Sequence, residues 1–220
     1  MRIKHGKNLT IKDKKTVYID SSVIIGDNVT IYENNRIEGN TVIGDGVTLY
    51  PNNRIVDGKI SDSATVDNSH IEKAVVGKGC KIGPFARLRP DAVIGDNAVI
   101  GNFVEVKNAN VGSNTKACHL AYIGDADIGE NCNIGCGAIF VNYNGRKKQR
   151  TKVGDNCFIG SNCNIIAPVE IKSDAYICAG TTVTESIESD SLVIGRVRQE
   201  VKSGRAHNYL KEKNKDRKGE

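Results

Sequence analysis

Four histidines are the residues of this chain best suited to move a proton, because histidine is the side chain that titrates nearest to neutral pH. They are His5, His70, His119 and His207. Residue type alone does not select one of them, since a histidine without context is more often a packed or surface residue than a general base. The choice has to come from the motifs around each histidine.

A polar, basic segment, residues 141–152, is the second place where chemistry is expected. Its side chains include two amides, a phenol and three closely spaced cations: Asn142, Tyr143, Asn144, Arg146, Lys147 and Lys148. Guanidinium and ammonium groups are the usual protein ligands of phosphate. The segment interrupts an otherwise regular chain, which favours a functional loop. A tolerated surface insertion is the alternative.

The seven cysteines do not indicate disulfides or a metal site, because their number is odd and no Cys-x-x-Cys pair occurs. Four of them share one position of the repeat described next: Cys80, Cys132, Cys157 and Cys163. That placement predicts small buried hydrophobic residues in a reducing compartment. No set of three histidines with zinc-ligand spacing is present, so no metal is expected.

An aliphatic residue recurs every six positions along nearly all of the chain. The first run is Ile19, Ile25, Ile31, Ile37, Ile43, Leu49 and Ile55, and the last runs from Val153 to Val183. A helix requires a period of 3.6 and a half-buried strand a period of 2, so a period of six indicates a short strand plus a turn. Three such units make a triangular coil of about 18 residues, which predicts an all-β solenoid of about nine coils. Gly, Asn and Asp between the aliphatic residues suit tight corners.

The repeat also sets the expected domain boundaries. We expect an N-terminal cap over residues 1–18, a β-helix domain over residues 19–195 with the inserted loop 141–152, and a basic tail over residues 196–220. A short helix is expected within residues 197–213. The spacing does not determine the hand of the coil.

Composition narrows the functional classes. The chain has 220 residues, a net charge of +5 and no tryptophan. No apolar run is long enough to span a membrane, and residues 1–10 lack the apolar core of a signal peptide, so a cytoplasmic protein is expected. Lysines and arginines crowd the tail, but no aromatic residues alternate with them, so neither nucleic acid nor a membrane is the expected partner. A solvated end, or a tail that neutralises a phosphorylated ligand, fits better.

Specific motifs between Ile82 and Val183 resemble the hexapeptide-repeat acyltransferases. Within them, the resemblance is to the C-terminal acetyltransferase domain of the bifunctional bacterial enzymes that make UDP-N-acetylglucosamine. The motifs are Gly83-Pro-Phe-Ala-Arg-Leu-Arg-Pro90, Gly101-Asn-Phe-Val-Glu-Val-Lys107, Lys116-Ala-Cys-His-Leu-Ala-Tyr-Ile-Gly-Asp125, Asn133-Ile-Gly135, Val141-Asn-Tyr-Asn-Gly145 and Ala179-Gly-Thr-Thr-Val183. The resemblance implies a left-handed β-helix and weakens towards Val17.

The chain departs from that family in three ways. The nucleotidyltransferase domain that precedes this region in the family is absent from the sequence, so no uridylyl transfer is expected. Cys118 and Cys136 replace the small residues usual at these positions. The segment Ala138-Ile-Phe-Val141 and Asn144 also differ from the family pattern. The last two departures are expected to adjust the acetyl-CoA groove or the substrate preference.

The resemblance implies transfer of an acetyl group from acetyl-CoA to the amine of glucosamine-1-phosphate. It assigns His119 as the general base, Glu105 as the group that orients its imidazole, and Asn142 as a catalytic residue that binds the sugar or amine. A backbone N–H near Asn142 and Tyr143 would stabilise the thioester oxyanion. The phosphate and sugar would be bound by Arg89, Lys107, Tyr122, Asn133 and Lys148. Acetyl-CoA would contact Cys136, Tyr143, Ser161, Ala179 and Arg196.

The resemblance also implies a homotrimer with active sites at the subunit interfaces. Two other functions stay open at this point. One is a hexapeptide acyltransferase acting on another amino sugar or nucleotide sugar, since the same cations would bind either phosphate. The other is a regulatory or assembly β-helix without activity, which the complete set of His119, Asn133, Asn142 and Lys148 argues against.

Overall fold

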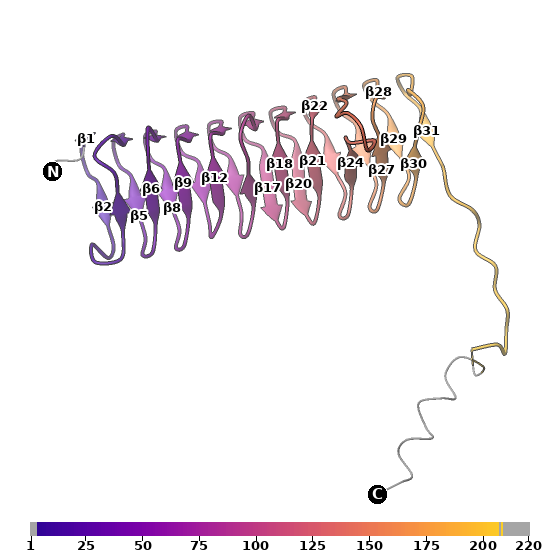
Figure 1. The fold of residues 1–220 in the computed structure, drawn as a ribbon, viewed down its shortest axis with the longest axis horizontal. Helices are drawn as coiled ribbons and strands as arrows, with labels where there is room; N and C mark the ends of the chain where they lie inside the picture. Colours follow the sequence, from indigo (N-terminus) through magenta and orange to yellow (C-terminus); the bar gives the residue numbers. More distant parts are fainter. Residues whose placement is uncertain (1–3, 207, 209–220) are drawn as a thin grey trace, which may run out of the picture.

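The computed structural model describes residues 4–206 and 208, and its architecture is a left-handed parallel β-helix (Figure 1). The described chain contains 31 strands of two to four residues. They form three parallel sheets of 10, 11 and 10 strands, so each coil contributes one strand to each face of a triangular prism. Ten coils are complete and an eleventh begins, where the sequence predicted about nine.

The strands of sheet A are β1 (Lys4–His5), β4 (Ile24–Ile25), β7 (Val42–Ile43), β10 (Lys59–Ile60), β13 (Val75–Val76), β16 (Val93–Ile94), β19 (Asn110–Val111), β22 (Ala126–Ile128), β25 (Thr151–Val153) and β28 (Glu170–Ile171). Those of sheet B are β2 (Thr10–Ile11), β5 (Thr30–Ile31), β8 (Thr48–Leu49), β11 (Thr65–Val66), β14 (Lys81–Ile82), β17 (Val99–Asn102), β20 (Lys116–His119), β23 (Asn133–Ile134), β26 (Phe158–Ile159), β29 (Tyr176–Ile177) and β31 (Leu192–Val193). Those of sheet C are β3 (Tyr18–Ile19), β6 (Arg36–Glu38), β9 (Arg54–Val56), β12 (His70–Glu72), β15 (Arg87–Leu88), β18 (Glu105–Lys107), β21 (Tyr122–Gly124), β24 (Ile139–Val141), β27 (Asn164–Ile166) and β30 (Thr182–Val183).

The six-residue period produces the core as predicted. Each recurring aliphatic residue points inward and pairs with its counterpart one coil away, as Ile25 does with Ile43 and Ile43 with Ile60. Successive layers lie about 4.8 Å apart, so the interior is a continuous stack of buried Ile, Val and Leu. The four cysteines of the repeat are buried and free, as expected. Burial raises the pKa of the Cys80 and Cys163 thiols, which keeps them protonated.

Residues in the left-handed backbone conformation turn the corners of the prism. Most of the non-glycine residues with positive φ are asparagine or aspartate, such as Asn28, Asn52 and Asn97. Their short polar side chains tolerate this conformation better than other side chains do. Most corners are therefore formed by the Asn and Asp residues that lie between the aliphatic positions, as the sequence predicted.

Both ends of the solenoid differ from the expected boundaries. Residues 4–19 already form a coil, with β1, β2 and β3 paired to β4, β5 and β6, where an irregular cap was expected. Leu9, Ile11, Val17 and Ile19 pack against the core, but the repeat positions Ile11 and Ile19 are eight residues apart, which breaks the six-residue spacing that would have revealed them.

At the other end the solenoid continues to Val193 in β31. Residues 197–206 form no strand or helix, and the rest of the helix expected within 197–213 lies almost entirely outside the described residues. The described part of the chain contains no helix long and apolar enough to cross a membrane.

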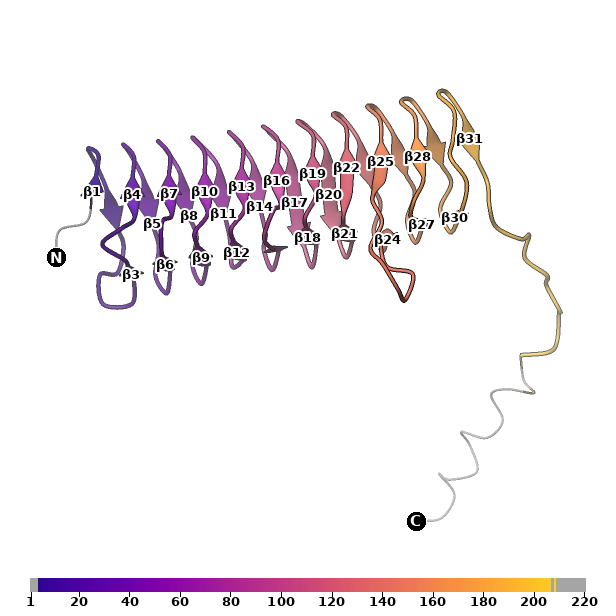
Figure 2. The same ribbon diagram turned by 45° about the horizontal axis from the view of Figure 1, so that its top comes forward.

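The one long insertion leaves the prism between sheet C and sheet A. Strand β24 ends at Val141 and β25 begins at Thr151, and the intervening loop projects from the rod (Figure 2). Ile128 pairs with Val153, 25 residues later, where neighbouring coils are about 18 residues apart. The coils on both sides keep their register, so the loop is added to the solenoid without disturbing it.

We expect the core to be most sensitive at Phe140, which is 0% exposed in the strand before this loop. Replacing Phe140 by Ala leaves a cavity in a stack of close-packed layers and should lower the free energy of unfolding by about 3–5 kcal/mol. The adjacent Ile139 is 36% exposed on the outer face, so Ile139→Ala is the matched control and should cost about 1 kcal/mol or less. Urea unfolding followed by circular dichroism measures both, and equal losses would contradict the packing described.

Candidate active site

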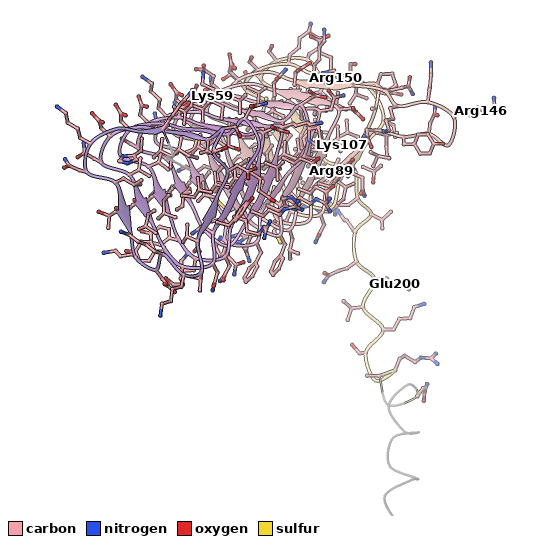
Figure 3. The ribbon with its side chains drawn as sticks, turned by 60° about the vertical axis from the view of Figure 1, so that its left-hand side comes forward. Lys59, Arg89, Lys107, Arg146, Arg150 and Glu200 are labelled. Carbon is pink, nitrogen blue, oxygen red and sulfur yellow. The ribbon has the colours of Figure 1, made fainter. Side chains whose placement is uncertain are left out.

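A cluster of cations lies at the edge of sheet C that faces sheet A. The pairing of Leu88 with Val106 places Arg89 beside Lys107 in the next coil. Glu105, on the same face, accepts a hydrogen bond of 2.8 Å from Arg89 and forms an ion pair with it. The carboxylate holds the guanidinium over sheet C and raises the pKa of Arg89. Arg89 and Lys107 are seen close together in Figure 3.

The inserted loop brings a third cation to this cluster. The ammonium groups of Lys148 and Lys107 are near enough that Lys148 lowers the pKa of Lys107, with burial and Arg89 acting in the same direction. Like charges are not stable side by side unless an anion or solvent compensates them. Three of the residues predicted to bind phosphate, Arg89, Lys107 and Lys148, therefore lie together.

Tyr122 and Asn142 complete the cluster on the side of the later coils. The Tyr122 ring lies over Gly124, where an added Cβ would be 2.5 Å from the phenol oxygen. Asn142 donates a hydrogen bond of 3.5 Å to that oxygen and a second, short one to the carboxylate of Asp125. Asn108 donates to the other oxygen of Asp125. Asp125 is buried at the corner, so it fixes the first residue of the loop next to the cations.

Arg150 anchors the other end of the loop. Its guanidinium donates two hydrogen bonds of 2.6 Å to Asp127 on strand β22, and further ones to the carbonyl oxygens of Asn108 and Ala126. This two-pronged geometry is the one that an arginine forms and a lysine does not. Arg150 holds the pKa of Asp127 below its usual range. The pair therefore stabilises the loop fully above about pH 4 and is lost as the pH falls through the lowered pKa of Asp127.

Replacing Arg150 by Lys should loosen the loop that carries Lys148. We expect trypsin to cut after Lys147 and Lys148 about 10-fold faster than in the unmodified chain, because the lysine cannot reproduce four hydrogen bonds. Arg146→Lys is the matched control, since Arg146 lies at the exposed tip of the same loop (Figure 3). Equal cleavage rates in the two variants would show that Arg150 does not anchor the loop.

His119 ends strand β20 at the opposite edge of sheet C, the corner shared with sheet B. It pairs in register with Asn102, and its Nδ1 lies 2.6 Å from the Asn102 amide oxygen. That oxygen can only accept, so Nδ1 is the donor and Nε2 of the neutral ring keeps a free lone pair. Within the chain, Asn102 is therefore the residue that orients the imidazole. Glu105, to which the sequence assigned this role, is paired with Arg89 in the chain, and its action on His119 stays a prediction.

The other histidines are placed less favourably for proton transfer. His70 lies in the same file of sheet C as Arg54 and Arg87, and burial, together with these two cations, lowers its pKa. Its Nε2 is buried without a partner. His5 is exposed in the first coil, where its ring contacts the carbonyl oxygen of Gly6. His207 lies outside the described residues.

A file of small side chains continues from His119 along the corner between sheets B and C. The register of strands β20, β23, β26 and β29, extended by two residues, places Cys136, Ser161 and Ala179 one above another in the three coils after His119. The coils approach closely here, since a Cβ on Gly160 would lie 2.4 Å from the Ala179 amide nitrogen. Arg196 closes the file by donating a hydrogen bond of 2.9 Å to the Ala179 carbonyl oxygen. Four of the five residues predicted to contact acetyl-CoA are thus aligned.

Two predicted site residues lie elsewhere. Asn133 is on the outer face of sheet B beside Lys116, separate from the cations of sheet C. Tyr143 is in the inserted loop, where its hydroxyl donates to the Gly145 carbonyl oxygen, and this loop leaves the corner between sheets C and A. Among residues 4–206 and 208, no group of three His, Cys, Asp or Glu side chains is arranged to hold a metal ion.

Two residues of the site escaped the sequence prediction. Asn102 lies next to a corner of the prism. An asparagine there is explained by the backbone conformation that corners require, so nothing in the sequence indicated a role for its side chain. Arg150 looks like one more cation of a basic loop, and its partner Asp127 lies 23 residues earlier. Only the register of the coils brings either residue to its partner.

Comparison with known proteins agrees with this architecture. Residues 15–57, 73–108 and 150–185 match the model of the bacterial transferase hexapeptide family (six repeats), and these ranges make up more than half of the chain. The chain is 46% identical over 200 residues to the bifunctional protein GlmU of Acetivibrio thermocellus, and 50% identical over 198 residues to that of Caldicellulosiruptor saccharolyticus. Each alignment covers 90% of this chain and 43% of the relative, so the chain spans less than half the length of these relatives.

Among solved structures, the chain is similar in fold to LpxA, a UDP-N-acetylglucosamine acyltransferase from Bacteroides fragilis. The TM-score is 0.57 at 22% identity, and the similarity covers 80% of this chain and 68% of that one. At this level of identity the similarity concerns the β-helix and not the chemistry of its surface.

Proposed function

The chain belongs to the bacterial transferase hexapeptide family, and from that premise we propose that it transfers the acetyl group of acetyl-CoA to the amine of glucosamine-1-phosphate. The product would be N-acetylglucosamine-1-phosphate, a precursor of UDP-N-acetylglucosamine and the cell wall. The observation that carries the proposal is the arrangement around sheet C. His119, whose Nδ1 is held by Asn102, lies at one edge, and the cations Arg89, Lys107 and Lys148 lie together at the other.

The positions of the amine and the phosphate in the substrate fit the base and the cations at the two edges of sheet C. In glucosamine-1-phosphate the amine on C2 and the phosphate on C1 are on adjacent carbons, so base and cations must act on neighbouring groups. The six residues from His119 to Gly124 span at most about 17 Å of extended chain, and the turn at Leu120 shortens this distance. The long side chains of Arg89, Lys107 and Lys148 reach over the face from the far edge. Tyr122 lies between the two edges and would contact the sugar.

In the proposed reaction Nε2 of His119 accepts the proton that the sugar ammonium must lose before its nitrogen can attack. The new C–N bond forms as the thioester C–S bond breaks, the imidazolium returns that proton to the departing CoA thiolate, and the second proton that the nitrogen loses on becoming an amide goes to solvent. Asn102 keeps the proton on Nδ1 throughout and stabilises the imidazolium. Asn142 would contact the sugar, and a backbone N–H beside Tyr143 would stabilise the oxyanion.

Acetyl-CoA would lie along the corner file of Cys136, Ser161 and Ala179. Side chains this small would leave room beside the backbone for the thin pantetheine arm. Arg196, at the end of the file, would meet the phosphates of CoA. We further propose that the chain acts as a homotrimer whose sites lie at the subunit interfaces. In one chain Asn133 lies away from the cations, and Tyr143 lies away from the corner file. In the trimer both would act across an interface.

A thiol-release assay tests the reaction. Glucosamine-1-phosphate should release CoA from acetyl-CoA well above background, and UDP-glucosamine and glucosamine-6-phosphate should release little. Release with UDP-glucosamine alone would favour the alternative, an acyltransferase for a nucleotide sugar. No release with any amino sugar, together with no change in thermal stability on adding acetyl-CoA, would support a β-helix without activity.

The orienting role of Asn102 predicts a change in the pH profile. Asn102→Leu should lower kcat about 10-fold without a comparable change in KM, because the imidazole loses its acceptor but the groove is intact. Asn102→Asp should move the acidic limb of the kcat profile to higher pH, since a carboxylate on Nδ1–H favours the imidazolium. An acidic limb that stays in place in Asn102→Asp would show that this hydrogen bond does not act on the base.

A further inference from the structure

Asp125 is the one charged side chain that is buried in the part of the chain that the structure describes, with 6% of its surface exposed. It turns the corner between sheets C and A with a φ of 48°. Asn108, at the same corner one coil earlier, is exposed. A buried carboxylate is costly unless donors and cations compensate its charge. Asp125 therefore depends on specific partners.

Two amide groups and two cations compensate this carboxylate. Asn108 donates a hydrogen bond to its Oδ1, and Asn142 donates another to its Oδ2. A carboxylate accepts hydrogen bonds and cannot donate them, so each asparagine must turn its NH2 group towards Asp125. The charge of Asp125 also acts on Lys107 and on Arg150. The carboxylate therefore dictates the orientation of both amides.

The orientation of Asn142 is passed on to Tyr122. The NH2 group of Asn142 lies beside Asp125 and also 3.5 Å from the Tyr122 hydroxyl oxygen, so both of its protons are used. No hydrogen bond formed within residues 4–206 and 208 ends on the amide oxygen of Asn142, which remains available as an acceptor. The Tyr122 hydroxyl accepts from Asn142 and must therefore direct its own proton away from it.

We propose that Asp125 is a positioning residue that fixes the hydrogen-bond polarity of the sugar site. It compels Asn142 to present an acceptor, and through Asn142 it compels Tyr122 to present a donor. A sugar group that meets Asn142 must then donate a hydrogen bond, and a group that meets Tyr122 must accept one. This inference rests on the proposed function, because it concerns how the proposed substrate is recognised.

The group that meets Asn142 follows from the two edges of sheet C. The amine of glucosamine-1-phosphate belongs to the edge of His119, whereas Asn142 lies at the edge of the cations. The phosphate offers no proton at neutral pH, since its second pKa is about 6. A sugar hydroxyl is therefore the donor to Asn142. Fluorine in place of that hydroxyl cannot donate, and it sets its lone pairs against the amide oxygen.

Binding of fluorinated sugars tests this polarity without acetyl transfer. Calorimetry in the absence of acetyl-CoA compares glucosamine-1-phosphate with its 3-, 4- and 6-fluoro analogues, each of which lacks one hydroxyl. The natural chain should bind at least one analogue about 10-fold or more weakly than glucosamine-1-phosphate, because the amide oxygen loses its donor. Equal Kd values for all four sugars would overturn the proposal. Binding of none of them would overturn the proposed function and this inference with it.

Variants at the corner show whether the carboxylate sets the preference. Asp125→Gly suits the φ of 48° and lets Asn142 turn over, so the disfavoured analogue should bind within about 3-fold of glucosamine-1-phosphate. Asn108→Gly is the matched control. It removes the other amide at a φ of 45° and leaves Asn142 held by Asp125, so it should keep a preference of about 10-fold.

A preference that survives in Asp125→Gly, or one that is lost in Asn108→Gly, would overturn the proposal. Circular dichroism and thermal unfolding establish that both variants keep the β-helix. Should Asp125→Gly not fold, Asp125→Asn keeps the size of the side chain and supplies an NH2 group to which the Asn142 oxygen can turn. The same loss of preference is expected in that variant, and its persistence would equally overturn the proposal.

Discussion

His119→Ala should lower kcat for acetyl transfer to glucosamine-1-phosphate by about 10²–10⁴-fold, the range that a positioned general base contributes. KM for both substrates should change little, because Nε2 acts on the proton of the amine and not on the phosphate or on CoA. Steady-state kinetics between pH 5.5 and 9 measure kcat and both KM values.

The control for this prediction is His5→Ala, which removes an exposed histidine in the first coil. It should leave kcat unchanged. Acetyl-CoA should raise the thermal stability of His119→Ala as much as that of the natural chain, which separates a lost base from a lost binding site. A kcat within 3-fold of the natural value, with binding intact, would remove His119 as the base.

Lys107→Met should raise KM for glucosamine-1-phosphate by about 10- to 100-fold, because a hydrogen bond between charged groups contributes about 1.5–3 kcal/mol. Methionine keeps the length and packing of the side chain, so the loss is that of the charge. The diagnostic comparison is glucosamine without the phosphate. It should be acetylated poorly by the natural chain and equally poorly by the variant, and a loss with both sugars would show that Lys107 supports the fold or the base instead.

The proximity of Lys148 adds a pH dependence to the same prediction. Because Lys148 lowers the pKa of Lys107, Lys107 begins to lose its proton at a lower pH than an ordinary lysine. Affinity for the phosphorylated sugar should therefore weaken as the pH rises through that lowered pKa. In Lys148→Met the remaining affinity should persist to higher pH. An identical alkaline limb in the variant and the natural chain would contradict the electrostatic coupling of these two lysines.

Much of the fold could be predicted from the sequence because each six-residue unit repeats a local physical requirement. An inward aliphatic residue, a small residue and a corner residue recur together, so the register of nearly every strand from Ile19 to Val183 follows from spacing. The first coil was missed because its repeat positions Ile11 and Ile19 are eight residues apart and not six. Its apolar residues become recognisable only when they are stacked under the second coil.

The site was less predictable because its contacts run between coils. Arg89, Lys107 and Lys148 are 18 and 41 residues apart in sequence and meet only through the register of sheet C and the inserted loop. The motifs indicated which residues to examine but not their partners. Glu105 was expected beside His119 and lies against Arg89, while the acceptor for His119 is Asn102, one coil earlier on sheet B.

The exposure of Phe85, Phe103 and Leu120, at the corner between sheets B and C, could not be predicted. Phe85, Phe103 and Leu120 sit in motifs whose apolar residues, read along the sequence, are indistinguishable from core positions. Their exposure follows from the left-handed corner conformation, which turns these side chains outward. The strain and the exposure become visible only when the coil is closed.

The most direct test of the account is to follow the acetyl group to the atom it reaches. The chain is incubated with acetyl-CoA labelled with 13C at the carbonyl and with glucosamine-1-phosphate labelled with 15N, and the product is observed by nuclear magnetic resonance. We predict a one-bond 13C–15N coupling in a phosphorylated sugar, formed at least 100-fold faster by the natural chain than by His119→Ala. A 13C label found on a sugar oxygen or only as free acetate, or an amide formed equally fast without His119, would contradict the account.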